Sequence, residues 1–251
     1  MCTVTYLPQA AGGYIFTSNR DEQAARSPEK LSQIVNPQGL SLTLPQDTAG
    51  GSWIVLSEDG RLACLLNGAF VRHQRKLPYR RSRGLVVLDF FSFNNGQEFW
   101  DQYDFNQIEP FTLISIEAGY QIEGRWDGQQ LHLRHFPADE PQIWASATLY
   151  TAEMQLERQE WWETFLNTAR GQEPAEVQFQ KTAKEVENFH LTAGKGDPAT
   201  NLRMSRPEYG VETVSVSQIV AEPTSLSFRY HELIKGVVDE LKWAVPHLSS
   251  K

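Results

Sequence analysis

Sequence patterns that mark several common classes of protein are absent from this chain. Its 251 residues include two cysteines, too few for the disulfide framework of a small secreted protein. Its six histidines form no His-Glu-x-x-His motif, and paired Cys-x-x-Cys motifs do not occur. Its glycines form neither a dinucleotide-binding loop nor a Walker-type loop. The sequence therefore predicts no metal site and no cofactor.

Positive charge and long apolar runs are also scarce. The chain has 23 Lys and Arg against 31 Asp and Glu, a net charge of −8, so we expect no binding to nucleic acid. The longest apolar runs, such as residues 85–91, are far too short to span a membrane. The first residues lack the basic flank and apolar core of a secretory signal. We therefore expect a cytoplasmic protein.

The overall composition is that of a globular protein. Hydrophobic residues make up 40% of the chain and charged residues 22%, which is enough apolar material to bury a core. The length suits one large domain or two small ones. We predict a single domain over residues 1–251.

Alternating polar and apolar residues predict two β-hairpins near the N-terminus. Residues 2–7 and 14–18 form the first hairpin, and the polar cluster 19–22 follows its second strand. A second hairpin ends at Asn67. Its strands and the further expected strands are residues 52–57, 61–66, 111–116, 120–126, 131–135, 143–146, 211–219 and 224–230. Helices are expected at residues 85–93, 96–103, 151–169, 175–190 and 231–242. Strands and helices occur in groups, which favours a layered antiparallel α+β domain.

Cys2 is the first candidate for chemistry. Removal of the initiator methionine before a small residue would leave a thiol and a free α-amine on one residue. The amine has a pKa of about 7.7–8.0 and can act as general base for the thiol. Retention of Met1 would remove this mechanism, and a cysteine at position 2 also occurs by chance. Cys64 lies within a predicted strand and is interpreted as a small buried hydrophobe.

Two polar groups at the ends of predicted strands could assist such a nucleophile. The first hairpin would bring Arg20 and Asp21 beside Cys2, where the guanidinium lowers the thiol pKa and the carboxylate holds the ammonium. The side-chain amide of Asn67 suits the stabilisation of an oxyanion. A solvated turn at residues 20–22 and a plain Asn-Gly turn at Asn67 are the alternatives.

Six basic residues fall within twelve positions, and they suggest either an anion site or a solvated loop. They are Arg72, Arg75, Lys76, Arg80, Arg81 and Arg83. Arginine and lysine bind phosphate or carboxylate groups. The interleaved aromatic residues of a nucleic-acid surface are represented by Tyr79 alone, and a solvated loop is favoured.

Five short motifs follow one another along the chain. They are Cys2-Thr3, Asn19-Arg20-Asp21-Glu22, Gly50-Gly51-Ser52-Trp53, Asn67 and Ser82-Arg83-Gly84. In order and spacing they resemble the motifs of the Asn-Arg-Asp-Glu family, which includes the transport and Golgi organisation protein 2 group. The resemblance extends from Cys2 to about residue 220.

This family in turn resembles the choloylglycine hydrolases and penicillin V acylases, a branch of the N-terminal-nucleophile hydrolases. The resemblance implies a four-layer αββα sandwich of two antiparallel sheets, in agreement with the α+β pattern. It implies that Cys2 is the nucleophile, that Asp21 holds its amine and that Asn67 belongs to the oxyanion hole. Arg20 is a further catalytic candidate, although the arginine of the hydrolases lies a few residues before the aspartate.

Candidate ligand-binding residues follow from the same motifs and from one departure. They are Asn19, Trp53, Arg83 and Ser146. The hydrolases have a second asparagine near position 146, where this chain has a serine with a shorter side chain. The basic residue that commonly follows a late Tyr-Gly in the family is replaced by Val211 and Glu212.

These observations predict one of two functions. The first is an N-terminal cysteine hydrolase that cleaves the C–N bond of a linear amide through an acyl-enzyme on Cys2. The second is a non-catalytic ligand-binding or trafficking protein that handles haem, lipid or an acyl chain. The expected partner is accordingly a small-molecule amide or an amphipathic ligand.

Overall fold

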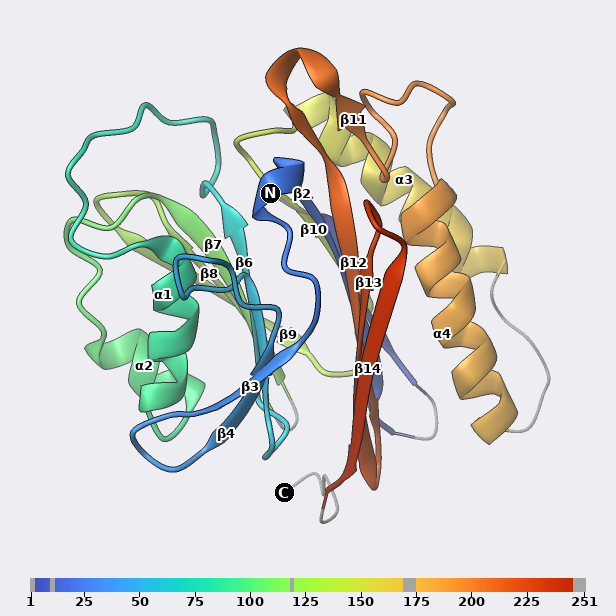
Figure 1. Cartoon of the computed structure of the whole chain (residues 1–251), viewed down its shortest axis with the longest axis horizontal. Helices are drawn as coiled ribbons and strands as arrows, with labels where there is room; N and C mark the ends of the chain where they lie inside the picture. The colour runs from blue at the N-terminus through green and yellow to red at the C-terminus, as the bar shows by residue number, and fades with distance from the viewer. Residues whose placement is uncertain (1–2, 10–11, 118–119, 169–174, 246–251) are drawn as a thin grey trace. The chain divides into compact units, whose positions relative to one another are not determined.

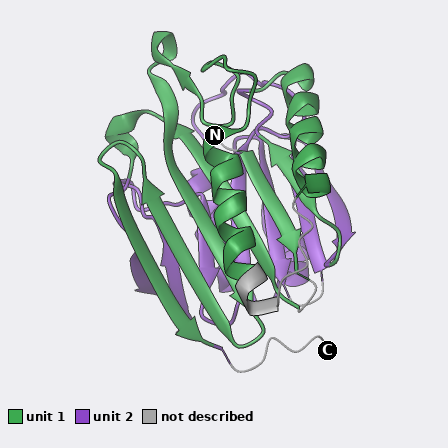
Figure 2. Ribbon diagram, turned by 90° about the vertical axis from the view of Figure 1, so that its right-hand side faces the viewer, with its two compact units in different colours: residues 1–27, 139–145, 150–244 green, residues 28–138, 146–149, 245–251 purple. Residues whose placement is uncertain are grey.

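Two antiparallel β-sheets and four α-helices make up the described part of the computed structural model (Figure 1). The structure describes residues 3–9, 12–117, 120–168 and 175–245, without the side chains of 175–178. Contacts divide the chain into two compact units, shown in Figure 2. The first comprises residues 1–27, 139–145 and 150–244, and the second comprises 28–138, 146–149 and 245–251. The single domain expected over residues 1–251 stays a prediction.

The first unit is a sheet covered on one face by two helices. The sheet has the order β10-β1-β2-β12-β13-β14, with β11 paired to β12. Its strands are β1 (Thr3–Pro8), β2 (Tyr14–Glu22), β10 (Gln142–Ala145), β11 (Ser205–Arg206), β12 (Val211–Glu222), β13 (Ser225–Glu232) and β14 (Val237–Ala244). The helices α3 (Ala152–Thr168) and α4 (Ala175–Thr192) run beside the sheet in Figure 1. Ile15 and Val220 of the sheet pack against Trp162, Val186 and Phe189 of these helices.

The second unit is a seven-stranded meander in which each strand pairs with the next along the chain. Its strands are β3 (Ser32–Val35), β4 (Ser41–Leu44), β5 (Ile54–Ser57), β6 (Leu62–Asn67), β7 (Phe111–Glu117), β8 (Tyr120–Trp126) and β9 (Leu131–Pro137). The helices α1 (Arg83–Asp89) and α2 (Gly96–Gln102) pack on it through an aromatic core. Gly124 admits the Trp100 indole, because a Cβ there would lie 2.2 Å from the ring.

Most of the predicted elements are confirmed. The two N-terminal hairpins form, with Val4 opposite Ser18 in the first and Ile54 opposite Cys64 in the second. The three-strand meander and the four helices before residue 193 also lie where the pattern places them. Among the described helices, none is long and apolar enough to cross a membrane.

Two of the predictions about secondary structure are wrong. The cluster 19–22 does not leave the first hairpin, because β2 continues to Glu22 and pairs there with β12. The helix expected at 231–242 is absent. Instead β13 turns at Gly236, whose φ is +69°, and β14 pairs back onto it. In both places a partner strand supplies the backbone hydrogen bonds: β12, distant in sequence, for β2, and the directly preceding β13 for β14.

Two of the sequence motifs pack directly against each other in the second unit. The Ser52 amide donates to the Gly84 carbonyl at 3.1 Å. A Cβ placed on Gly51 would lie 3.0 Å from the Gly84 carbonyl carbon, which is tighter than nine in ten real Cβ contacts. The glycines at positions 51 and 84 are therefore required for close approach of the loop before β5 to the start of α1.

We expect Gly51→Ala to destabilise the protein by about 1–3 kcal/mol, because backbone atoms cannot yield to the added methyl group as a flexible side chain would. Ser82→Ala is the matched control. Ser82 is exposed and makes no side-chain capping bond to α1, so its replacement should change stability little. Chemical denaturation of the two variants measures the difference, and equal midpoints would contradict the packing argument.

Candidate active site

Cys2, the predicted nucleophile, lies outside the described residues, which begin at Thr3. The surroundings of the first strand are nevertheless well defined. Thr3 is buried and pairs with Ala145 of β10, and Val4 pairs with Ser18 of β2. The polar residues of β2 thus continue beyond the part of the strand that is paired with β1.

Asp21 is a fully buried carboxylate near the end of β2. Thr213 on β12 lies opposite it and donates from Oγ1 to Oδ1 at 2.6 Å. The Tyr150 hydroxyl donates to Oδ2. Burial raises the pKa of Asp21, and these two hydrogen bonds oppose that rise. The carboxylate is therefore held in one orientation by donors on two separate segments.

Arg158 connects this carboxylate to the start of the chain. It is fully buried in α3, and its guanidinium carbon lies 3.8 Å from the centre of the Tyr150 ring. Its Nε donates to Oγ1 of Thr3 at 3.2 Å. Its Nη1 donates to the Met154 carbonyl and its Nη2 to the Thr200 carbonyl, both at 3.0 Å. These contacts compensate for burial of the charge and join Thr3, Tyr150 and Asp21 into one network.

Sequence reasoning missed both Tyr150 and Arg158. A signal was present for the arginine, because it lies four residues after Met154 and three before Trp161. A charged residue within an apolar helical stripe is buried only when it has partners. Tyr150 precedes the helix and gives no such pattern.

Asn19 occupies the same face of β2 and is fully buried. Its amide nitrogen donates to the carbonyls of His190 at 3.1 Å and Leu202 at 2.9 Å. Its Oδ1 lies 2.6 Å from Nδ1 of His190, so this ring nitrogen carries the proton. The other ring nitrogen then accepts from the Thr5 hydroxyl at 2.8 Å. The amide of Asn19 thus joins β2 to α4 and to Leu202, and its predicted role in ligand binding stays a prediction.

Arg20 does not lie on the face that carries Asp21. Successive side chains of a strand point to opposite faces, so Arg20 projects away from Asn19 and Asp21. It is 5% exposed, and its Nη2 lies 3.7 Å from Oε2 of Glu22. Its predicted role, lowering the pKa of the Cys2 thiol, stays a prediction.

Asn67 and Ser146 come together in the second unit. Asn67 is the last residue of β6 and is half-buried, and its side-chain amide has no partner among the described residues. Ser146 is fully buried and donates its hydroxyl proton to the Asn67 carbonyl at 2.8 Å. The Ser146 hydroxyl also lies 3.2 Å from that of Thr148. Ser146 thus holds the backbone of Asn67, and its predicted role in ligand binding stays a prediction.

Trp53 and Arg83 were also predicted to bind ligand, and both are built into the second unit. Trp53 is buried just before β5, and its carbonyl accepts from the Leu65 amide at 2.7 Å. Arg83 donates from Nη1 to the Pro110 carbonyl at 3.1 Å, and its Nη2 lies 3.4 Å from the buried carboxylate of Glu109. Their predicted roles in ligand binding stay predictions.

Several residues of the basic segment are paired with carboxylates of their own unit. Glu109 also accepts ion pairs from His73 at 3.1 Å and Arg75 at 3.4 Å. Arg80 lies 3.4 Å from Asp104, and Arg81 pairs with Asp89. The interpretations as solvated loop and as anion site are thus both incomplete, because these arginines hold the loop onto the unit. Among the described residues, no three His, Cys, Asp or Glu side chains gather as metal ligands.

The buried His190 makes stability depend on pH. Burial lowers its pKa from 6.5 to about 3, so the unfolded chain binds a proton that the folded chain rejects. The stabilisation is complete above pH 6.5 and is lost as the pH falls towards 3. We expect His190→Gln to reduce the slope of unfolding free energy against pH in this interval by up to about 1.4 kcal/mol per pH unit.

Denaturant titrations at several pH values measure this slope. The exposed His135 is the control, and His135→Gln should leave the slope unchanged. An equal slope in wild type and His190→Gln would contradict the assignment of His190 as a buried neutral residue.

Solved hydrolase structures resemble this chain in fold. The mutant conjugated bile acid hydrolase from Clostridium perfringens matches with a TM-score of 0.52 and 12% identity, over 98% of this chain and 97% of that one. Penicillin V acylase from Agrobacterium tumefaciens matches with a TM-score of 0.57 and 11% identity, over 96% and 86%. The Caenorhabditis elegans ortholog of N-acylethanolamine-hydrolyzing acid amidase matches with a TM-score of 0.54 and 12% identity, over 87% and 92%.

These likenesses confirm the predicted fold class. Two antiparallel sheets with four helices match the αββα structures of N-terminal-nucleophile hydrolases over nearly the full chain. Identities of 11–12% show the fold alone.

The sequence itself gives the family. No curated protein matches it. The sequence model of the Transport and Golgi organisation 2 family matches residues 1–136, more than half of the 251 residues. This match confirms the resemblance carried by the five motifs, all of which fall within that range. The chain belongs to the Transport and Golgi organisation 2 family.

Proposed function

We propose that the chain is an N-terminal cysteine hydrolase that cleaves a linear, non-peptide amide. The observation that carries the proposal is the buried network of Thr3, Arg158, Tyr150 and Asp21. It joins the residue after Cys2 to a carboxylate held by the donors Tyr150 and Thr213. A carboxylate at the start of the chain is what an N-terminal amine acting as general base requires for its orientation.

In the proposed reaction the Cys2 thiol attacks the amide carbonyl, and its proton passes through the α-amine to the leaving nitrogen. The C–N bond breaks, and the acyl group remains on Cys2 as a thioester. Water then attacks the thioester, the same amine accepts the water proton, and the thiol is regenerated as the acid leaves. Asp21 orients the amine in both halves of the reaction.

Asn67 is assigned to the oxyanion of this reaction. Its side-chain amide is half-exposed and has no partner among the described residues, so its donors are available to a ligand. Its backbone is fixed by Ser146, which donates to its carbonyl. Preorganised donors of this kind stabilise a developing oxyanion without reorganising during the reaction. Ser146 is in this account a positioning residue.

We expect Cys2→Ala to reduce hydrolysis across a panel of acyl amides by at least about a hundredfold, since the covalent step is lost. The matched control is Cys64→Ala. Cys64 is fully buried in β6, and its removal should leave turnover within about threefold of wild type. If the wild type hydrolyses an amide and Cys2→Ala hydrolyses it at the same rate, the hydrolase assignment is contradicted.

Tyr150→Phe tests the role of Asp21 in the proposed reaction. It removes a hydrogen bond that lowers the pKa of this carboxyl, so Asp21 becomes ionised only at higher pH. We expect turnover at neutral pH to fall about tenfold and the acidic limb of the rate–pH profile to move to higher pH.

Tyr14→Phe makes the same chemical change on β2 and serves as the control. The buried Tyr14 hydroxyl has no hydrogen-bond partner among the residues that the structure describes, so both the rate and the profile should stay as in wild type. A Tyr150→Phe enzyme that loses activity with an unshifted profile would show a packing defect rather than an effect on Asp21.

A non-catalytic ligand-binding or trafficking function is the second candidate. Two observations favour it. Burial raises the pKa of Asp21, and a neutral carboxyl holds an ammonium less well. The Ser146 hydroxyl is committed to Asn67 and does not replace the second asparagine of the hydrolases. Saturable binding of haem or a fatty acid that persists in Cys2→Ala, without turnover of any amide, supports this function, and no binding of either ligand counts against it.

A further inference from the structure

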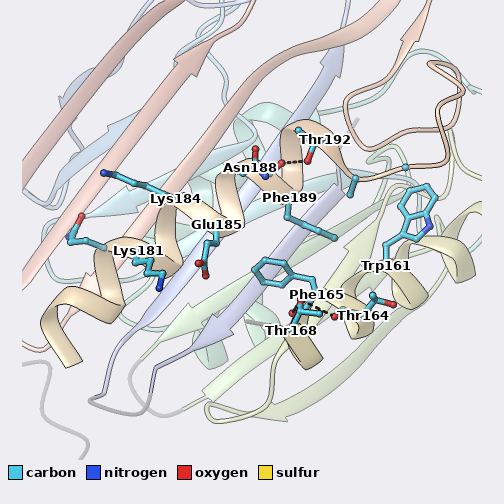
Figure 3. Close-up of a pocket in the computed structure, with 13 residues that line it drawn as sticks. Trp161, Thr164, Phe165, Thr168, Lys181, Lys184, Glu185, Asn188, Phe189 and Thr192 are labelled. Atoms are coloured by element: carbon cyan, nitrogen blue, oxygen red, sulfur yellow. Dashed lines mark hydrogen bonds between the residues drawn. The ribbon is translucent and has the colours of Figure 1, made fainter. Parts of the chain in front are cut away.

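A groove of about 1200 Å³ lies between α3 and α4 of the first unit (Figure 3). Its aromatic lining residues are Trp161 and Phe165 of α3 and Phe189 of α4. The groove remains open because the neighbouring positions carry short side chains. These are Thr164, Thr168, Thr192, Ala193 and Gly194. Its volume is somewhat larger than that of typical small-molecule sites, which are about 300–1,000 Å³.

The floor of the groove is rigid. The rings of Phe165 and Phe189 have centroids 5.1 Å apart, and both contact the buried indole of Trp162 at 5.2 and 5.3 Å. Figure 3 shows Phe165 and Phe189 pointing towards one another from the two helices. Aromatic rings that already pack together cannot collapse to fill the space above them. The apolar surface is thus preformed for a ligand.

The polar edge of the groove is biased towards positive charge. Lys181 and Lys184 line it from α4, and among the described lining residues Glu185 is the one carboxylate. Lys184 is exposed and makes no ion pair within the described part of the chain. The protein as a whole carries a net charge of −8, so this local excess of lysine is opposite in sign to the rest of the molecule.

We propose that this groove is a binding site for an apolar organic anion, with its ring-containing body on the aromatic floor and its anionic group beside Lys181 and Lys184. Burial of apolar surface supplies most of the affinity, and the lysines select an anion over a neutral molecule of the same shape. The site is separate from the candidate active site and requires no chemistry from Cys2.

The direct test uses two fluorescent probes with similar apolar bodies. 8-Anilinonaphthalene-1-sulfonate carries an anionic group, and N-phenyl-1-naphthylamine does not. We expect both to bind to the folded wild-type protein, the sulfonate more tightly. Cys2→Ala should bind both as wild type does, so failure of the hydrolase proposal would leave this result unchanged.

Thr164→Trp tests the location, because the indole would fill the groove from α3. We expect it to weaken both probes about tenfold or more, a change of at least about 1.4 kcal/mol. The control is Asn167→Trp, which adds the same side chain at an exposed position of α3 that does not line the groove. Binding that is equal in the two variants would overturn the proposal.

The double variant Lys181→Ala/Lys184→Ala tests the charge. We expect it to weaken the sulfonate about fivefold and to leave the neutral probe within about twofold. Arg203→Glu changes the net charge by the same two units at an exposed residue outside the groove lining, and should leave both probes unchanged. A sulfonate affinity lowered equally by Arg203→Glu, or a neutral probe weakened as much as the sulfonate, would contradict a lysine-selected anion.

Discussion

A carboxylate without access to water is the constraint on which the first unit depends. Asp21 is fully buried in the first unit, where an unpaired charge is costly in free energy. Its environment therefore has to supply donors, and it does so from the Tyr150 hydroxyl and from Thr213. Arg158 stacks on Tyr150 and is itself satisfied by carbonyl oxygens and by Thr3. Three elements of the unit, β1, β12 and α3, are fixed relative to β2 by this network.

β2 holds a second buried polar network at Asn19, which is two residues before Asp21 and lies on the same face of the strand. Asn19 makes two hydrogen bonds to His190 and one to the Leu202 carbonyl, and His190 in turn accepts from Thr5. Both networks border the α3/α4 groove. Trp161 lies 5.7 Å from the Arg158 guanidinium, and Phe189 contacts the His190 ring at 5.7 Å. Residues that line the groove thus contact Arg158 and His190, which belong to the networks around the Asn-Arg-Asp-Glu motif.

Local pattern was sufficient to predict much of the fold. Alternation and turn residues located the hairpins, the meander and the helices before residue 193, because these elements are specified by their own periodicity. The pattern failed where pairing with another strand decides the outcome. β2 runs through Glu22 because β12, distant in sequence, pairs with it. β14 replaces a helix because it pairs with β13, which directly precedes it, across a turn at Gly236 that the pattern did not reveal.

The candidate site was predicted in its residue types but not in its connections. Asp21 and Asn67 were found from motif order, and Asp21 proves to be buried with two donors while Asn67 keeps its amide available. The roles of the residues around Asp21 and Asn67 were not predicted. Arg20 and Asp21 are neighbours in sequence and occupy opposite faces of β2. Ser146 supports Asn67 from a segment 79 positions away, and no spacing rule indicates that contact.

The central claim, that Cys2 is an activated N-terminal nucleophile, is tested most directly by the intact mass of the untagged protein before and after reaction with a thiol-directed acylating probe. The account predicts loss of Met1 and a single adduct, because Cys64 is fully buried and Cys2 is the only other cysteine. Fragmentation should place the adduct on Cys2. A retained Met1, or an unmodified Cys2 in the folded protein, would contradict the account.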